Sequence, residues 1–301
     1  MLNATETVLR ARRQKTVIPA YNIPYLSMVK PVIQAIVDEN SIAMIQVARV
    51  EWEKFGAQSP EAVAKEYLKY ANPHHTLLHL DHVPVIDEDQ KHVDYKSILE
   101  KSIDDGYQSV MIDGSRLSLS ENIEATKWAA ELAHTAQIPC EAELGAVMGH
   151  ESGPMMPYEE LFATKKGFTN PEEAKLFAKE SGCDWLSIAA GSVHGAVAEN
   201  LRHQKKPEAR LDIGHIAAIA EITRLPLVLH GGSGINVECI HQAIAAGIAK
   251  INVGTEIRQA FEFSIEKSSE DIEAAQDAVY QAVRSNINML KIKNSRLLLY
   301  P

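Results

Sequence analysis

The residues best suited to chemistry in this 301-residue chain stand at the ends of apolar runs. The run LLHLDHVPV presents Asp81 beside His82, and two later runs end in His194 and His230, each followed by glycine. One buried histidine is usually structural, but several polar groups at the ends of core strands are costly unless they are paired or bind something. Three imidazoles with a carboxylate beside one of them suit Zn²⁺, or a similar divalent metal, with an open coordination position. We therefore predict that His82, His194 and His230 are metal ligands.

A glycine-rich stretch follows the last of these histidines. The sequence HGGSG, residues 230–234, leaves bare backbone N–H groups just before a helix that we expect to begin near residue 236. Such an arrangement favours an anion. The next apolar run carries NVGT, residues 252–255. Because adjacent loops after the last two strands of a barrel commonly hold a phosphate, the two stretches together predict a phosphate site.

Eight apolar, often β-branched runs alternate with segments of helical period, which indicates buried parallel strands joined by helices. We predict the strands at 16–23, 42–48, 76–82, 109–115, 139–147, 185–195, 226–234 and 249–255. This order is typical of a (β/α)₈ TIM barrel, here with an extra N-terminal helix and a C-terminal helical extension, in one domain over residues 1–301. An open doubly wound sheet is the alternative, but it favours a glycine-rich turn after an early strand, and the first strand ends in AYNIPY. His79, three residues before His82, is predicted to face the other side of its strand as a structural residue.

Composition excludes several classes of partner. The formal net charge of -10 repels phosphate backbones, so we do not expect nucleic acid as the main partner. No stretch approaches 18 apolar residues, and the charged N-terminal segment has no apolar core of a signal peptide, so we expect no membrane partner and a cytoplasmic protein. The 3 cysteines lie far apart without a C-x-x-C unit, which indicates incidental thiols.

Six motifs, HLDH, SVMIDGS, EAELG, GSVHG, LHGGSG and KINVGT, have the order and spacing of the class II, metal-dependent ketose-bisphosphate aldolases. The chain resembles this family, which includes fructose- and tagatose-bisphosphate aldolases, over nearly its whole length. The resemblance implies a zinc-dependent lyase of carbohydrate metabolism. It would reversibly cleave a ketose 1-phosphate or 1,6-bisphosphate to dihydroxyacetone phosphate and an aldehyde, through an enediolate. A monovalent cation (Na⁺ or K⁺) near the phosphate and a homodimer or homotetramer are also implied.

The resemblance further implies roles for individual residues. Asp81 matches the general acid/base that acts on the hydroxyl next to the bond that breaks. Glu151 matches a mobile-loop glutamate that moves a proton at the enediolate carbon, and Asn22 matches an asparagine that contacts the substrate. Asp113 and Glu143 match an alternative, more exposed metal position. The implied phosphate site comprises Gly195, Gly231, Gly232, Ser233, Asn252, Val253, Gly254 and Thr255.

Several positions depart from the family pattern, mainly around the aldehyde half of the substrate. Gln46-Val47 is followed by Ala48-Arg49-Val50, where the family commonly has Ser-Glu-Gly, and a longer loop follows HLDH. We therefore predict a non-standard ketose phosphate as substrate. Arg49 is a candidate for recognising a carboxylate, a sulfonate or a second phosphate, and a structural arginine is the alternative.

Three other functions fit the sequence less well. A non-catalytic or regulatory relative would not need the intact Asp81 and Glu151. A metal-dependent hydrolase on the same barrel usually carries His-x-His on its first strand, which here reads PAYNIP. A Schiff-base mechanism has Lys250 as its one candidate on a strand, and it would leave the three histidines without a role.

Overall fold

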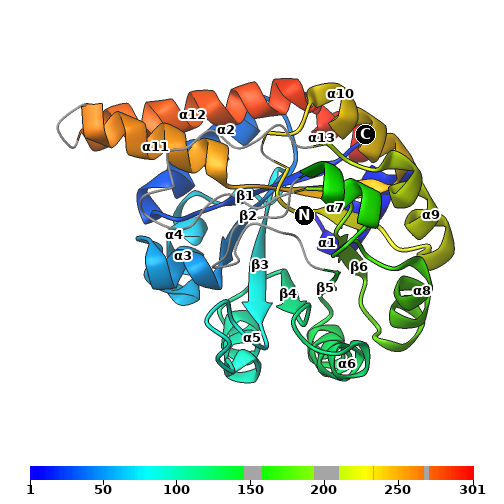
Figure 1. The fold of residues 1–301 in the computed structure, drawn as a ribbon. Coiled ribbons are helices and arrows are strands. Elements are labelled where there is room, and N and C mark those ends of the chain that lie inside the picture. Colours follow the sequence, from blue (N-terminus) through cyan, green and yellow to red (C-terminus); the bar gives the residue numbers. More distant parts are fainter. Residues whose placement is uncertain (146–157, 193–209, 233, 268–270) are drawn as a thin grey trace.

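The chain folds into a closed barrel of eight parallel strands (Figure 1). The structure is a computed structural model, and it describes residues 1–145, 158–192, 210–232, 234–267 and 271–301. The strands follow one another around the barrel in chain order, and β8 closes the ring by pairing with β1. They are β1 Ile18–Asn22, β2 Ala43–Ala48, β3 Thr76–Pro84, β4 Ser109–Asp113, β5 Cys140–Leu144, β6 Trp185–Ile188, β7 Leu227–Leu229 and β8 Ile248–Val253. The predicted (β/α)₈ barrel is confirmed, and the alternative prediction of an open doubly wound sheet is wrong.

Helices surround the barrel and follow most of its strands. Their bounds are α1 Ala4–Arg13, η1 Leu26–Met28, α2 Val29–Asp38, α3 Arg49–Lys54, α4 Pro60–Tyr70, α5 Tyr95–Asp104, α6 Leu119–Thr135, α7 Tyr158–Thr164, α8 Pro171–Glu180, α9 Ile213–Thr223, α10 Val237–Ala246, α11 Thr255–Lys267, α12 Ile272–Met289 and α13 Ser295–Leu299. Side-chain caps fix several starts. Ser118 and Glu121 form a capping box at α6, and Asn236 accepts a backbone N–H at the start of α10. Among the described residues, no helix is long and apolar enough to cross a membrane.

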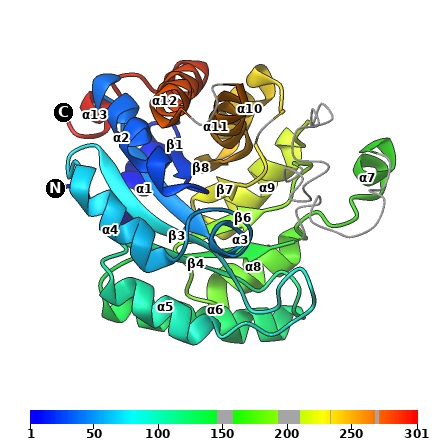
Figure 2. The ribbon, with the colours of Figure 1, turned by 90° about the vertical axis from the view of Figure 1, so that its left-hand side faces the viewer.

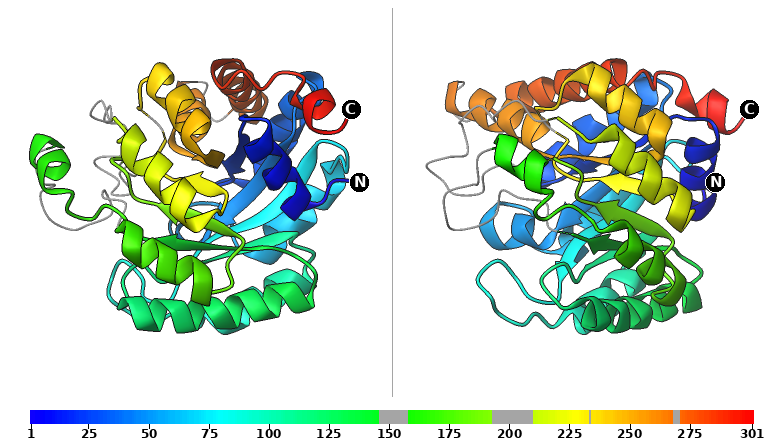
Figure 3. Two further views of the ribbon diagram at one scale, coloured as in Figure 1. Left: turned by 90° about the vertical axis from the view of Figure 1, so that its right-hand side faces the viewer. Right: turned by 45° about the vertical axis from the view of Figure 1, so that its right-hand side comes forward.

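Two apolar layers hold the barrel together. The larger lies between the strands and the surrounding helices. The smaller fills the N-terminal part of the barrel, where α1 packs Val8 and Ala11 against strand residues such as Met44 and Trp185. The chain termini meet at this end, where α13 lies beside α1 (Figures 2 and 3). The predicted N-terminal helix therefore plugs one end of the barrel and leaves the other end for polar residues.

The C-terminal extension is a pair of long helices. α11 and α12 pack side by side and reach beyond the barrel wall, and α12 also packs against α2 (Figure 1). α7 lies outside the ring of barrel helices (Figure 2). The predicted helical extension is confirmed.

The later strands are shorter than their apolar runs suggested. β6 ends at Ile188, although the run continues through Ala189 and Ala190. Both alanines are buried, but their carbonyls accept hydrogen bonds from Thr169 and Asp212 in neighbouring loops. An apolar run indicates burial, not strand pairing. The two buried alanines therefore belong to the run, although their backbone hydrogen bonds go to loops instead of to a neighbouring strand.

Candidate metal centre and active site

An irregularity in β3 brings two adjacent residues into the barrel. Neighbouring residues of a regular strand point to opposite faces, so Asp81 and His82 should diverge. The β3–β4 register shifts between Leu80 and Val83, and His82 has a φ of 32°, which a bulged residue adopts. His79 and Asp81 keep the regular alternation and both face the interior, and the bulge turns His82 inward as well. The prediction that His79 faces away from the site is therefore wrong.

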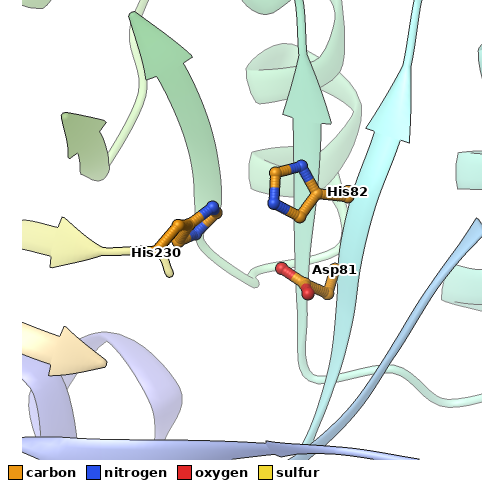
Figure 4. A group of neighbouring side chains, drawn as sticks. All are labelled: Asp81, His82 and His230. Atoms are coloured by element: carbon orange, nitrogen blue, oxygen red, sulfur yellow. The ribbon is translucent and has the colours of Figure 1, made fainter. Parts of the chain in front are cut away.

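His82 meets His230 across the mouth of the barrel. The two ring centroids are 4.4 Å apart, and His230 follows β7, on the far side of the barrel from β3. One potential ligand atom from each of Asp81, His82 and His230 lies within 4.8 Å of the other two, and Figure 4 shows the three side chains around one space. Two of the three predicted histidine ligands are thus brought together.

Two carboxylates approach the same imidazoles. Glu143 Oε2 lies 3.2 Å from His230 Nδ1 and 3.8 Å from His82 Nδ1, and Asp113 Oδ2 lies 3.2 Å from His82 Nδ1. Burial alone would lower the pKa of His82, but Asp81, Asp113 and Glu143 raise it to about 10. His82, Asp113 and Glu143 also form a group that could hold a metal ion. The predicted alternative metal residues therefore adjoin the histidine pair.

Glu141 supports this centre from inside the barrel. Its Oε1 lies 2.9 Å from His230 Nε2, and its Oε2 lies 2.9 Å from Lys250 Nζ. Because Nε2 faces Glu141, His230 presents Nδ1 to the mouth of the barrel, as in the carboxylate–histidine–metal arrangement. Burial alone would raise the pKa of Glu141, but Lys250 and His230 hold it below its usual range. No motif in the sequence pointed to a role for Glu141, although its spacing of two residues from Glu143 places both on one face of β5.

Asp81 is held as a charged carboxylate by three amides. Its Oδ2 accepts from Asn22 Nδ2 at 3.0 Å and from Gln46 Nε2 at 3.1 Å, and its Oδ1 accepts from Asn252 Nδ2 at 2.9 Å. Burial would raise the pKa of Asp81, but His82, Lys250 and other cationic neighbours hold it below its usual value. The predicted Asn22 and Asn252 therefore meet Asp81 directly, and Gln46 is a further partner that the sequence did not reveal.

Lys250 lies deep in the same layer. Its side chain is fully buried, and its ammonium group donates to Asn252 Oδ1 at 2.7 Å in addition to its ion pair with Glu141. The ion pair and the hydrogen bond give the ammonium group a structural role. This geometry does not favour Lys250 as a Schiff-base nucleophile.

The glycine-rich stretches frame a cavity beside this network. Gly231 has a φ of 67°, and a Cβ at Gly232 would lie 2.8 Å from Ile251 Cδ1, so both positions suit glycine. A cavity of about 200 Å³ is lined by Gly232, Asn252 and Val253 among others, and Thr255 begins α11 just beyond them. Gly254 lies against Asn22. The described part of the predicted phosphate site is therefore contiguous.

Arg49 lies at the rim, in the first turn of α3. Its guanidinium group is 3.4 Å from Asp87 Oδ2 and 3.6 Å from Glu53 Oε1, and 23% of its side chain is exposed. Asp87 belongs to the long loop after β3, whose backbone it also caps by accepting from Asp89 and Lys91 N–H. Arg49 thus links α3 to this loop while part of it faces solvent.

Four predicted residues lie outside the described residues. They are Glu151, His194, Gly195 and Ser233.

The donors that are present fit a divalent transition metal. Two imidazoles face one space, a buried carboxylate orients one of them, and further carboxylates lie at its edge. Zinc and similar divalent transition metals bind imidazole nitrogen and carboxylate oxygen. Buried charges of this kind also require a partner of opposite charge. The candidate centre therefore suits a metal ion.

Comparison with known proteins agrees with this site. Residues 2–295 match the family model of class-II fructose-bisphosphate aldolases. The YdjI aldolase from Escherichia coli K12 is 25% identical, with a TM-score of 0.76 over 97% of this chain and 98% of that chain. The fold is also that of a fructose-bisphosphate aldolase from Campylobacter jejuni, which is 16% identical, with a TM-score of 0.73 over 97% of this chain and 96% of that chain. The chain belongs to the class II fructose-bisphosphate aldolase family and is a metal-dependent aldolase.

Proposed function

We propose that this aldolase reversibly cleaves a ketose 1-phosphate or 1,6-bisphosphate to dihydroxyacetone phosphate and an aldehyde, with Zn²⁺ or another divalent metal as cofactor. The observation that carries the proposal is the position of Asp81. It is a buried carboxylate oriented by three amide donors, beside two imidazoles that face one space. Such a group is suited to take a proton from a substrate hydroxyl next to a metal.

In this proposal His82, His194 and His230 hold the metal, and Asp113 and Glu143 offer the alternative position. The metal, when bound, would act as a Lewis acid towards the negative charge that remains on the three-carbon fragment. Glu141 keeps His230 turned towards the centre through its contact with Nε2. These residues fix the centre without taking part in proton transfer.

Asp81 and Glu151 divide the proton transfers between them. Asp81 takes the proton of the C4 hydroxyl as the C3–C4 bond breaks, the aldehyde leaves, and Asp81 returns the proton in the synthetic direction. Glu151 delivers a proton to C3 of the remaining fragment. The amide of Asn22 orients Asp81 and would contact the substrate.

The phosphate group is proposed to lie on the backbone N–H groups of the loops after β6, β7 and β8. Gly195, Gly231, Gly232 and Ser233 would form one side, and Asn252, Val253, Gly254 and Thr255 the other. Bare N–H groups close to a helix start, here that of α11, favour an anion. A Na⁺ or K⁺ ion is proposed to balance the phosphate charge there.

We also propose that the aldehyde half of the substrate departs from that of fructose bisphosphate. Arg49 lies directly after β2 and is partly exposed. The serine that the family commonly has would stand one residue earlier, in place of Ala48. An acidic group on the aldehyde would compete with Asp87 and Glu53 for its guanidinium group. A cytoplasmic homodimer or homotetramer of single-domain subunits completes the proposal.

The test is release of dihydroxyacetone phosphate from a panel of ketose 1-phosphates and 1,6-bisphosphates, with and without a chelator. Chelator-sensitive release is expected, with the best substrate outside the standard bisphosphates. A zinc-loaded protein that releases none from any member of the panel would favour a non-catalytic aldolase-like subunit.

A further inference from the structure

Lys250 places an ammonium group in the interior of the barrel. The residue stands on β8, and its side chain is fully buried. The ammonium group lies 2.9 Å from Glu141 Oε2 and donates to Asn252 Oδ1 at 2.7 Å. A buried ion pair is weak evidence for stability, because well-packed apolar residues of similar volume often hold a fold equally well. The partners of the two contacts point to a further role for Lys250.

The first partner leads to the proposed base. Asn252 Nδ2 donates to Asp81 Oδ1 at 2.9 Å. The other two amides at this carboxylate, those of Asn22 and Gln46, both donate to Oδ2. An ammonium group can only donate, so it requires the oxygen of the Asn252 amide and leaves the amide nitrogen for Asp81. Lys250 therefore fixes which end of the Asn252 amide meets Oδ1 of the base.

The second partner leads to the proposed metal ligand. Glu141 offers Oε2 to Lys250 and Oε1 to His230, whose Nε2 lies 2.9 Å away. His79 Nε2 also faces Oε2, at the longer distance of 3.5 Å. The two oxygens of a carboxylate lie in one rigid plane, so a contact that holds one of them also fixes the direction of the other. Lys250 thus sets the plane of Glu141, and Glu141 turns His230 Nδ1 towards the mouth of the barrel.

We propose that Lys250 is a positioning residue that sets the orientation of Asp81 through Asn252 and of His230 through Glu141. The proposal rests on the proposed function, because it concerns the base and a metal ligand of that reaction. An ammonium group has three hydrogens and can donate to a carboxylate and an amide together, whereas a thioether of similar length can donate to neither. Asp81 and His230 come from β3 and from the end of β7, and this one group keeps both turned to one space.

The decisive comparison is Glu141→Gln against Glu141→Gln/Lys250→Met, both saturated with zinc. The second change removes the ammonium group that the first leaves without its carboxylate, so the double variant should be at least as stable as Glu141→Gln. Its kcat for cleavage should nevertheless fall a further 10- to 100-fold, roughly, while KM changes by less than about threefold, because a misplaced base costs the chemical step more than binding. A purely structural lysine predicts that kcat follows stability, and an equal kcat in the two proteins would overturn the proposal.

A second background tests the route through Asn252. In Asn252→Ala, adding Lys250→Met should lower kcat by less than about threefold, because the amide that Lys250 positions is already absent. A further loss of about tenfold or more would contradict that route. Lys293→Met is the matched control: Lys293 also pairs with a buried glutamate, at 2.8 Å from Glu39 Oε2, and this change should leave kcat unaltered.

The route through Glu141 has a readout that does not depend on turnover. In Lys250→Met the carboxylate keeps its contacts with His230 and His79, so we expect a folded protein. Competition with a chelator should show zinc affinity lowered roughly 3- to 10-fold by Lys250→Met, and no further loss when the same change is added to Glu141→Gln. Unaltered zinc affinity in Lys250→Met would overturn the proposal. Absence of chelator-sensitive release by the unaltered protein would refute the proposed function instead, and the zinc titration would still decide whether Lys250 acts on His230.

Discussion

Replacing Glu141 by glutamine should weaken both the fold and the metal centre. Glu141 and Lys250 are fully buried, and their charged atoms lie 2.9 Å apart. Coulomb's law with an effective dielectric constant of about 20 gives an attraction of roughly 6 kcal/mol at that distance. Desolvation offsets much of this in the intact pair, but removing one partner leaves a buried charge and typically costs about 3–5 kcal/mol. We therefore expect Glu141→Gln to lower the free energy of unfolding of the metal-free protein by about that amount.

The assay is urea unfolding of chelator-treated protein for Glu141→Gln, Lys250→Met and the double variant. The double variant should lose less stability than the sum of the single variants, because it removes both charges of one pair. Glu141→Gln should also lower zinc affinity by roughly 10- to 100-fold, since His230 loses its carboxylate, and Lys250→Met should lower it less. Additive losses in stability, or a Glu141→Gln protein that binds zinc as tightly as the unaltered chain, would refute this account of the barrel interior.

Three further predictions follow from the same site. Burial raises the pKa of Glu51 from 4.5 to about 8, so the folded protein binds this proton more tightly than the unfolded chain. The contribution of Glu51 to the free energy of unfolding therefore falls as pH rises from 4.5 to about 8. Thermal unfolding of Glu51→Gln should show a smaller loss of stability over this pH range. Arg49→Ala should reduce kcat/KM for substrates with an acidic aldehyde end roughly tenfold relative to uncharged ones, and unchanged relative activity across the panel would end the recognition hypothesis. His82→Ala should abolish stoichiometric zinc binding by metal analysis, and full zinc content in this variant would remove His82 from the ligand set.

The architecture followed from the sequence because burial and periodicity determine it. Parallel strands buried on both faces appear as apolar runs, and their spacing with helical segments leaves few alternatives to a barrel. Strand ends were harder to place. At β6 the apolar run continues beyond Ile188, and only the three-dimensional loops show that its backbone leaves the sheet.

The candidate site was predictable in composition and less so in geometry. His82, His230 and Asp81 could be selected because polar residues at the ends of core strands need partners. The bulge that turns His82 inward beside Asp81 could not be read from alternation, and without it the orientation of His79 relative to His82 was predicted wrongly. Long-range partners such as Glu141 for His230 depend on the closure of the barrel, so a single sequence does not reveal them.

Hydrogen exchange at C3 of dihydroxyacetone phosphate tests the division of labour at the metal centre most directly. Zinc-loaded protein in deuterated water should exchange this hydrogen in a chelator-sensitive manner. Asp81→Asn should retain the exchange while its cleavage of ketose phosphate falls by about 10²-fold or more, because only cleavage needs the C4 hydroxyl proton removed. No exchange by the zinc-loaded protein, or cleavage by Asp81→Asn at the unaltered rate, would contradict the proposed mechanism.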